Sequence, residues 1–327
     1  MASENKSWVT AADVARLAGV SRSAVSRTFT PGASVSEPTR QKVMAAASEL
    51  GYQVNIIART MITGNSNFVG IITAGFDNPF RSKLLAPLVH HLTLQGFIPL
   101  LMNADDPRQL APSLRQLLSY HVTGVIITSG APPLSLAEEY LAKKIPVMLI
   151  NRDADLPGAD RICSDNAQGA KRIAALFREQ GLQRLAFIGE EAENFSTSER
   201  WQAFREQAPQ ALALFCPRGG YQAGWDAAAK LLADYPDLQA IFCATDMLAM
   251  GTLDYLREHP AFSAIKVAGF DDIPQAAFAA YQLTTIRQDT DKLAQVAVHS
   301  LLERLKNFTQ PSQQKTVPVT LIRRLSA

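Results

Sequence analysis

The sequence of 327 residues contains few cysteines, and their wide spacing matches neither a disulfide framework nor a metal-ligand motif. We therefore expect Cys163, Cys216 and Cys243 to be small buried side chains in a reducing compartment. The N-terminal residues lack the apolar segment of a secretory signal, and no apolar run is long enough to span a bilayer. These absences predict a cytoplasmic protein with no metal site, no cofactor and no membrane partner.

Charge is also sparse, at 19% charged residues and a net charge of +2, in an otherwise ordinary globular composition. It is unevenly distributed. Residues 1–60 hold seven Lys or Arg against four Asp or Glu, an excess of three, so the remainder of the chain sums to −1. The basic excess fits a nucleic-acid contact at one end of the chain, although inert domains also carry such a charge. The length suits two or three domains.

Residues 10–52 show only helical patterns, in three short segments. Thr10 and Asp13 have the spacing of a capping box that opens the first helix, and Ser21 can cap the second. The other helix signals are Gly19 and Pro31–Gly32 as breaks, Ser36 as a cap and Gly51 as a stop. The pattern predicts a small independent helical unit.

From Phe68 onward, apolar runs typical of β-strands alternate with amphipathic helical segments. The runs are FVGIIT, IPLLMN, GVIITS, PVMLIN, RLAFIG, AIFCAT and IKVAGF. This alternation predicts parallel sheets with helices on both faces, and the continuous apolar runs predict strands buried on both sides. Residues 67–327 suit two α/β lobes better than one. Functional residues should then follow the carboxyl ends of strands and face a cleft.

The stretch DVARLAGVSRSAVSR allows two interpretations. In a helix-turn-helix, the second helix places its N-terminal residues in the major groove of DNA. Arg22 could pair there with a guanine edge, Ser23 could bond a base edge, and the Ala24 methyl could meet a thymine methyl. Ser21 and Ser26 would suit phosphate contacts. The alternative is a plain three-helix cap with a solvated basic face.

The longer segment VTAADVARLAGVSRSAVSRTFTPGASVSEPTRQKVMAAASELGYQVN closely resembles the DNA-binding headpiece of the LacI/GalR family of bacterial transcriptional regulators. The resemblance continues through FVGIITAGFDNPF, GVIITSG, CSDNAQGA, FCATDMLAMG, VAGFDD and LTTIRQD. It implies a small all-α helix-turn-helix headpiece, a hinge helix and an α/β core of two doubly wound lobes, like that of periplasmic sugar-binding proteins. We expect the headpiece at residues 1–53, the hinge at 54–66 and the core for effector binding and dimerisation at 67–327. Lobe 1 would take about 67–165 and 289–317, and lobe 2 about 166–288 and 318–327.

The resemblance implies a homodimer that binds near-palindromic double-stranded operator DNA. In the family, the hinge helix inserts an apolar side chain into the minor groove, usually Leu, and the matching residue here is Met61. Val54 stands where the family often has proline. The predicted DNA-binding residues are Thr10, Ser21, Arg22, Ser23, Ser26, Arg27, Asn55, Ala58 and Met61.

The resemblance also implies an effector between the lobes. Arg200 matches the arginine that holds a ligand hydroxyl or carboxylate, and Asp271 matches an acid that accepts hydrogen bonds from the ligand. Such a pair suits a polyhydroxylated molecule, because each hydroxyl both donates and accepts. The predicted effector-binding residues are Phe76, Asn78, Phe80, Thr128, Asn151, Ser196, Arg200, Tyr221, Asp246, Asp271 and Gln288.

Several effector residues also have a structural interpretation. Arg200 could form a surface ion pair with Glu190 or Glu191, Asp271 could cap a turn, and Phe80 and Tyr221 could pack against neighbouring side chains. Asp246 suits a structural role better than a contact specific to the ligand.

The sequence therefore predicts a transcriptional regulator, most often a repressor in this family, that works in the cytoplasm on the nucleoid. Its effector would be a sugar, polyol or sugar acid, with a purine or another metabolite as the alternative. An enzyme is disfavoured because the sequence has no phosphate loop, no GxSxG elbow and no metal-ligand cluster. A small-molecule binding protein without a DNA role is the third possibility.

Overall fold

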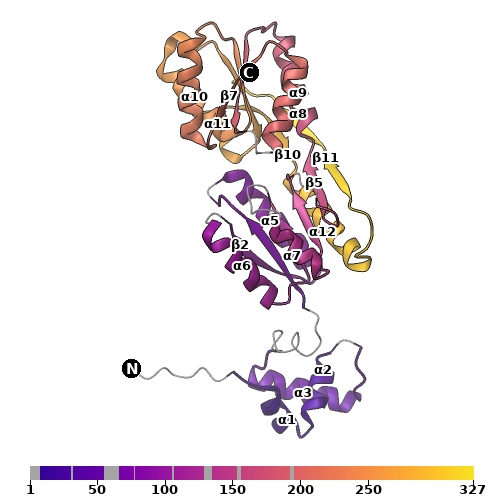
Figure 1. Ribbon diagram of the computed structural model, residues 1–327. Helices are drawn as coiled ribbons and strands as arrows, with labels where there is room; N and C mark the ends of the chain where they lie inside the picture. The colour runs from indigo at the N-terminus through magenta and orange to yellow at the C-terminus, as the bar shows by residue number, and fades with distance from the viewer. Residues whose placement is uncertain are drawn as a thin grey trace. The chain divides into compact units, whose positions relative to one another are not determined.

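A computed structural model describes residues 8–30, 32–54, 66–76, 78–104, 107–128, 135–152, 156–191 and 195–327. The chain forms two compact units, Met1–Ser66 and Asn67–Ala327 (Figure 1). The predicted hinge contacts Asn55, Ala58 and Met61 lie outside the described residues.

The first unit contains three helices: α1 (Ala11–Ala18), α2 (Arg22–Thr28) and α3 (Glu37–Leu50). The capping box of Thr10 and Asp13 is confirmed, and Gly19 ends α1 with a left-handed φ of 64°. Ser21 caps α2, since its side chain accepts a hydrogen bond from the Ala24 amide. Ser36 stands at the N-cap of α3, but its hydroxyl pairs with the Thr39 hydroxyl and makes no cap bond. The core of this unit is Val14, Ala15, Val25, Val43, Ala46 and Ala47.

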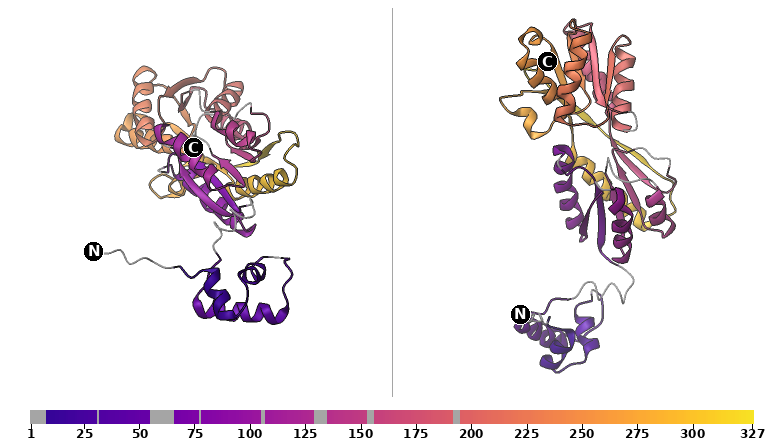
Figure 2. Two further views of the ribbon diagram at one scale, coloured as in Figure 1. Left: turned by 60° about the horizontal axis from the view of Figure 1, so that its bottom comes forward. Right: turned by 60° about the vertical axis from the view of Figure 1, so that its left-hand side comes forward.

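The second unit divides into two lobes, each built on one sheet (Figures 1 and 2). Among the described residues, the first lobe has six parallel strands in the order β11-β5-β4-β3-β1-β2. Their bounds are β1 Phe68–Thr73, β2 Ile98–Asn103, β3 Gly124–Ile127, β4 Val147–Ile150, β5 Asp160–Ser164 and β11 Gln314–Val317. The helices of this lobe are α5 Pro79–Leu94, α6 Pro107–Ser119, α7 Ser135–Ala142 and α12 Thr290–Lys306.

The second lobe has the strand order β12-β10-β9-β8-β6-β7, in which β12 alone of the described strands runs antiparallel. The bounds are β6 Leu185–Glu190, β7 Leu212–Cys216, β8 Ala240–Cys243, β9 Lys266–Asp271, β10 Thr284–Gln288 and β12 Val319–Ile322. Its helices are α8 Asn166–Glu179, α9 Phe195–Gln207, α10 Tyr221–Asp234 and α11 Asp246–Glu258, with short 3-10 helices at Pro260–Phe262 and Pro274–Ala277.

The chain passes from one lobe to the other after β5, after β10 and after β11. At the first two passages an aspartate caps the helix that follows: Asp165 accepts from the Gln168 amide, and Asp289 accepts from the Lys292 amide. The third passage is tied to the first, because the Asp165 amide donates to the Val317 carbonyl over 2.9 Å. The carboxyl ends of β4, β5, β9 and β10 are thereby brought together.

The predicted fold class is confirmed: a small helical unit is followed by two doubly wound α/β lobes. The seven predicted runs became β1, β2, β3, β4, β6, β8 and β9. Within the described ranges, no helix combines the length and the apolar character that crossing a membrane requires.

Candidate functional site

The predicted base-reading side chains share one exposed face of α2. Arg22, Ser23 and Arg27 are exposed, whereas Ala24 and Val25 are buried against the other two helices. Burial of Ala24 contradicts the expected contact of its methyl group with thymine, because the methyl packs inside the unit. The same burial fixes the rotation of α2, so the arginines must face outward.

Hydrogen bonds within the headpiece hold several side chains of this exposed α2 face in place. The Ser21 hydroxyl accepts from the Ala24 amide over 3.2 Å and lies 2.9 Å from the Ser23 hydroxyl. The Arg27 Nε donates to the Ser23 carbonyl over 3.4 Å. Thr10 is occupied by the capping box, where its amide and hydroxyl both donate to the Asp13 carboxylate. The Arg22 side chain makes no hydrogen bond within the described residues and keeps its donors for a partner.

The second group of predicted residues meets between the lobes, around the Arg200 guanidinium. Arg200 is only 3% exposed, which rules out the surface ion pair considered for it. Its Nε donates to Asn166 Oδ1 over 2.9 Å and its Nη1 to the Ala244 carbonyl over 2.6 Å. The guanidinium lies 3.6 Å from the centre of the Phe270 ring, a cation–π contact. These contacts fix the side chain with its Nη1 3.9 Å from Asp271 Oδ1.

Arg200 and Asp271 each keep one polar atom without a protein partner. Arg200 Nη2 and Asp271 Oδ2 make no hydrogen bond to a described residue. Both atoms are therefore free to bind a ligand. The site presents one strong donor group and one strong acceptor next to each other, in an otherwise buried setting.

Gln288 connects this pair to the first lobe. Its Nε2 donates to Asp271 Oδ1 over 2.6 Å, and its Oε1 accepts from Asn151 Nδ2 over 2.9 Å and from the Ser164 hydroxyl over 2.5 Å. Asn151, at the end of β4, has a left-handed φ of 50° and also accepts from the Ser164 amide over 2.8 Å. We call Asn151, Ser164, Arg200, Asp271 and Gln288 the interlobe cluster. Through the side chain of Gln288, it links the ends of β4 and β5 in one sheet to the ends of β9 and β10 in the other.

Buried carboxyls shift the proton affinities near this cluster. Burial raises the pKa of Asp246 to about 8, and the neighbouring Asp271 carboxylate adds to the rise. Burial also raises the pKa of Asp271, to about 6, while the Arg200 guanidinium opposes that rise. Burial lowers the pKa of Arg200, but a guanidinium remains protonated in proteins. Asp246 thus tends to hold a proton near neutral pH.

Asp246 is a support for the site. It is fully buried, and its two carboxylate oxygens contact the Ile273 amide at 2.9 Å and the Thr285 hydroxyl at 2.5 Å. Gly269 must remain small beside it, because a Cβ there would lie 2.3 Å from Asp246 Oδ1. The carboxyl is fully used inside the protein, so the structure gives it no atom to offer an effector.

The other predicted polar residues differ in whether their side chains still have a donor or acceptor for a ligand. Thr128 is buried and donates to the Thr73 hydroxyl over 2.7 Å. Asn78 caps α5, since its Oδ1 accepts from the amides of Phe80 and Arg81. Ser196, at 8% exposure on α9 one turn before Arg200, makes no hydroxyl hydrogen bond within the described residues. Ser196 is therefore the best placed of the three to bind a ligand.

The predicted aromatic walls differ in their burial and in their contacts. Phe80 belongs to the hydrophobic core with Leu84 and Leu88. The Tyr221 hydroxyl donates to Asp254 over 2.8 Å, as does the Tyr281 hydroxyl over 2.9 Å. Phe80 and Tyr221 are therefore better explained as side chains that pack inside the second unit. Phe76, at 37% exposure, is the most open of the predicted aromatic side chains, and Tyr221 is partly buried.

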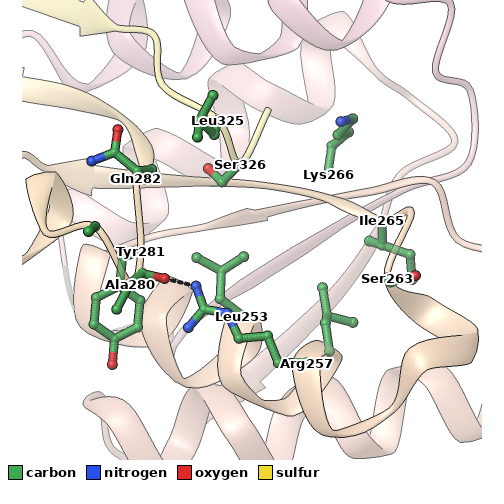
Figure 3. A pocket seen from close by; sticks show the side chains of 12 residues that line it. Leu253, Arg257, Ser263, Ile265, Lys266, Ala280, Tyr281, Gln282, Leu325 and Ser326 are labelled. Carbon is green, nitrogen blue, oxygen red and sulfur yellow. Dashed lines mark hydrogen bonds between the residues drawn. The ribbon is translucent and has the colours of Figure 1, made fainter.

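A separate pocket of about 300 Å³ lies at the amino ends of β9 and β10, the opposite end of the sheet from Asp271 (Figure 3). Arg257 in this pocket donates to the Ala280 carbonyl and is ion-paired with Asp254. The Gln282 amide donates to the Ala277 carbonyl, and the Ser326 hydroxyl to the Val267 carbonyl. These polar groups serve the fold, and none of the predicted effector residues lines the pocket. Within the described part of the chain, no cluster of three or more His, Cys, Asp or Glu side chains could hold a metal ion.

Some residues of the site were not predicted from the sequence. Asn166 and Ser164 hold Arg200 and Gln288, and Asp272 follows Asp271 in the turn after β9. The motifs CSDNAQGA and GFDD contain all three, so their positions were visible although their partners were not.

Comparisons with known proteins agree with this arrangement. Residues 10–55 match the model for bacterial regulatory proteins of the lacI family, and residues 174–327 match the periplasmic binding protein-like domain. The chain is 29% identical to the ribose operon repressor of Bacillus subtilis over 321 residues, covering 95% of this chain and 96% of the relative. It is 25% identical to the HTH-type transcriptional repressor PurR of Actinobacillus pleuropneumoniae, covering 95% and 96%.

Solved structures show the same fold. The lac repressor dimer bound to operator and the anti-inducer ONPF superposes with a TM-score of 0.86 at 23% identity, covering 98% of this chain and 99% of that one. A LacI family regulator from Enterococcus faecalis with bound ribose gives a TM-score of 0.73 at 24% identity, covering 80% and 98%. The chain therefore belongs to the LacI family of bacterial regulatory proteins, with a helix-turn-helix headpiece and a periplasmic-binding-protein-like core.

Proposed function

We propose that this LacI-family protein is a dimeric repressor that binds operator DNA through Arg22, Ser23 and Arg27 and releases or retains it according to a neutral sugar or polyol bound at Arg200 and Asp271. The observation that carries the effector class is the pair of open atoms, Arg200 Nη2 and Asp271 Oδ2. A hydroxyl group, or two adjacent ones, can accept from the first and donate to the second. Ser196 adds a hydroxyl nearby on α9.

The charges around Arg200 favour a neutral effector over an acid. Asp271, Asp246, Glu190 and Glu199 all lie within electrostatic reach of this one guanidinium. The Asp271 carboxylate, 3.9 Å from Arg200 Nη1, already neutralises the guanidinium charge, so an anionic effector would have to compete with it. A carboxylate or phosphate on the effector would be repelled, whereas a hydroxylated neutral molecule would not. The resemblance to the ribose operon repressors and to the ribose-bound regulator supports a pentose as the first compound to test.

A purine effector, as the relative PurR would suggest, fits the site less well. A purine ring is normally held by aromatic stacking. Phe80 is only 6% exposed and packs in the hydrophobic core, so one of the three predicted aromatic walls has little ring surface left for stacking.

The DNA role rests on the exposed face of α2 and on the lacI-family match over residues 10–55. The lac repressor relative binds its operator as a dimer, and two headpieces related by a two-fold axis would read two half-sites. Such an operator partner implies action in the bacterial cytoplasm.

A thermal-shift panel tests the effector class, because a ligand that binds the folded state raises its melting temperature. The panel contains D-ribose, ribitol, D-ribonate, ribose 5-phosphate and guanine. We expect stabilisation by a neutral member and little response to the two anions. Stabilisation only by an anion or by guanine would contradict the proposed class.

A further inference from the structure

The turn that follows β9 is fixed at three consecutive residues. Asp271 is held through its carboxylate by Gln288, and the Ile273 amide is held by the buried carboxylate of Asp246. Between them, the Asp272 carboxylate accepts from Arg287 Nε over 2.6 Å and from Arg324 Nη2 over 2.7 Å. Burial alone would raise the pKa of Asp272, but the two arginines together lower it below its usual value, so this residue stays ionised.

The backbone of the turn requires that support. Asp271 has a φ of 124° and Asp272 a φ of 51°, in the region that side chains other than glycine rarely adopt. Such conformations persist only where the surroundings over-determine them, and they concentrate at functional sites. The direction of the Asp271 carboxylate therefore depends on every contact that holds the turn.

One of these contacts comes from the other lobe. Lys83, on α5 of the first lobe, donates from Nζ to the Asp272 carbonyl over 3.1 Å. The same peptide unit donates its N–H, that of Ile273, to Asp246 at 2.9 Å, so it is held at both ends from opposite lobes. Among the described residues, the Asp272 carbonyl is the one hydrogen-bonding partner of the Lys83 ammonium.

The helix carrying Lys83 is itself firmly placed. Leu84, Leu88 and Leu92 on α5 are at most 2% exposed and belong to the main hydrophobic core. Lys83 is half-buried beside Leu84, so the position of its ammonium follows the first lobe. Any rotation of one lobe against the other must change its distance to the Asp272 carbonyl.

We propose that Lys83 is a positioning residue for Asp271: it holds the strained Asp271–Asp272 turn from the opposite lobe and so makes effector affinity depend on the angle between the lobes. This inference rests on the proposed function only in taking Asp271 as an effector ligand. A ligand bound to Asp271 would then have a higher affinity for one lobe arrangement than for the other. Such a difference in affinity is what allows a ligand to shift the equilibrium between the two arrangements.

The test uses the full chain with Lys83→Met, which keeps the apolar stem and removes the donor, and Lys83→Arg, which restores a cationic donor. Lys171→Met is the matched control, since Lys171 is a partly exposed lysine in the second lobe that pairs with Glu206 over 3.3 Å. Hydrogen exchange of peptides covering residues 268–276 reports the turn directly. Titration with D-ribose, or with whichever neutral panel compound stabilises the wild type, reports effector affinity.

We expect amide exchange across residues 271–275 to become at least five-fold faster in Lys83→Met and effector affinity to fall by five- to twenty-fold. Lys83→Arg should recover most of both, and Lys171→Met should match the wild type. Unchanged exchange in Lys83→Met would overturn the inference, as would faster exchange with unchanged affinity. If no panel compound binds the wild type, the proposed effector class fails, while the exchange measurement still decides whether Lys83 holds the turn.

Discussion

Asn151 Nδ2 donates to Gln288 Oε1 over 2.9 Å, and this bond joins the end of β4 in the first lobe to the end of β10 in the second. The same amide of Gln288 reaches Asp271 Oδ1 at 2.6 Å. A ligand that draws the Asp271 carboxylate toward itself must therefore also alter a contact between the lobes. The interlobe cluster provides a physical connection between effector binding and lobe geometry.

Gln288→Leu should destabilise the core. The substitution leaves Asp271 Oδ1, Asn151 Nδ2 and the Ser164 hydroxyl without the partner each has now. A buried polar group that loses its partner costs about 1–3 kcal/mol, so we expect a loss of about 2–4 kcal/mol in the free energy of unfolding. Urea denaturation measures it, with the exposed Gln222→Leu as control. A change below about 1 kcal/mol would show that the hydrogen bonds of Gln288 are not needed for stability.

Arg22→Ala should weaken specific operator binding by about 10- to 100-fold, the range expected for a bidentate contact to a base pair. Arg16→Ala is the control, because Arg16 lies exposed on α1 in an ion pair with Asp13. Fluorescence anisotropy on an operator selected from a random DNA pool gives both affinities. Equal losses in the two variants would remove the sequence-reading role from α2. Wild-type binding should also weaken steeply with salt, because phosphate contacts release counterions.

Ser21→Ala and Ser26→Ala separate helix capping from phosphate contact. Ser21 accepts from the Ala24 amide, so its removal should lower headpiece stability by about 1 kcal/mol. The exposed Ser26 hydroxyl makes no such bond, and Ser26→Ala should leave stability unchanged. Thermal unfolding followed by circular dichroism distinguishes the two. Both variants should bind DNA less tightly; normal affinity in Ser26→Ala would exclude it from the phosphate contacts.

Stability of the core should depend on pH through Asp246. Its pKa is raised from 3.8 to about 8 by burial, so the folded protein binds this proton more tightly than the unfolded chain does. The contribution to stability is therefore full below about pH 4 and is lost as the pH rises through about 8. Asp271, whose pKa is raised to about 6, adds a similar loss at lower pH.

Asp246→Asn isolates this contribution. The amide can still accept from Ile273 and donate to Thr285, but it carries no proton that titrates in this range. Urea denaturation at pH 6.5 and 8.5 should show a smaller loss of stability in the variant than in the wild type. Parallel losses would mean that Asp246 is already ionised at the lower pH.

The repeated patterns of the chain made most of the fold predictable. Apolar runs such as FVGIIT and AIFCAT became buried strands, and Gly19 and Gly51 end helices in the left-handed region. The strands β5, β7, β10, β11 and β12 were not identified, because sequences such as QKTV carry little apolar signal and gain their partners from distant segments. Helix α5 begins at Pro79, where the Asn78 side chain caps it, although the apolar periodicity of its first turn is weak.

The site was predictable in its residue types but not in its contacts. Arg200 and Asp271 were identified by motif, whereas Lys83 has no signal in the sequence because its partner, a backbone carbonyl, is 189 positions away. For Asp246 and Phe80 the sequence left an effector contact and a structural role open, and burial of both residues favours the structural role. Which of several polar residues still has an open atom depends on tertiary packing, and no local pattern encodes it.

Control of operator binding by a sugar at Asp271 is tested most directly by fluorescence anisotropy. Operator affinity is measured with and without the neutral sugar, for the wild type and for Asp271→Asn. Asparagine keeps an oxygen for Gln288 but loses the charge beside Arg200, so the variant should retain operator binding within about three-fold and lose the sugar response. The exposed Asp226→Asn serves as control. We predict that the sugar changes operator affinity in the wild type and in the control, but not in Asp271→Asn. A normal response in Asp271→Asn, or a wild type that binds no specific DNA, would contradict it.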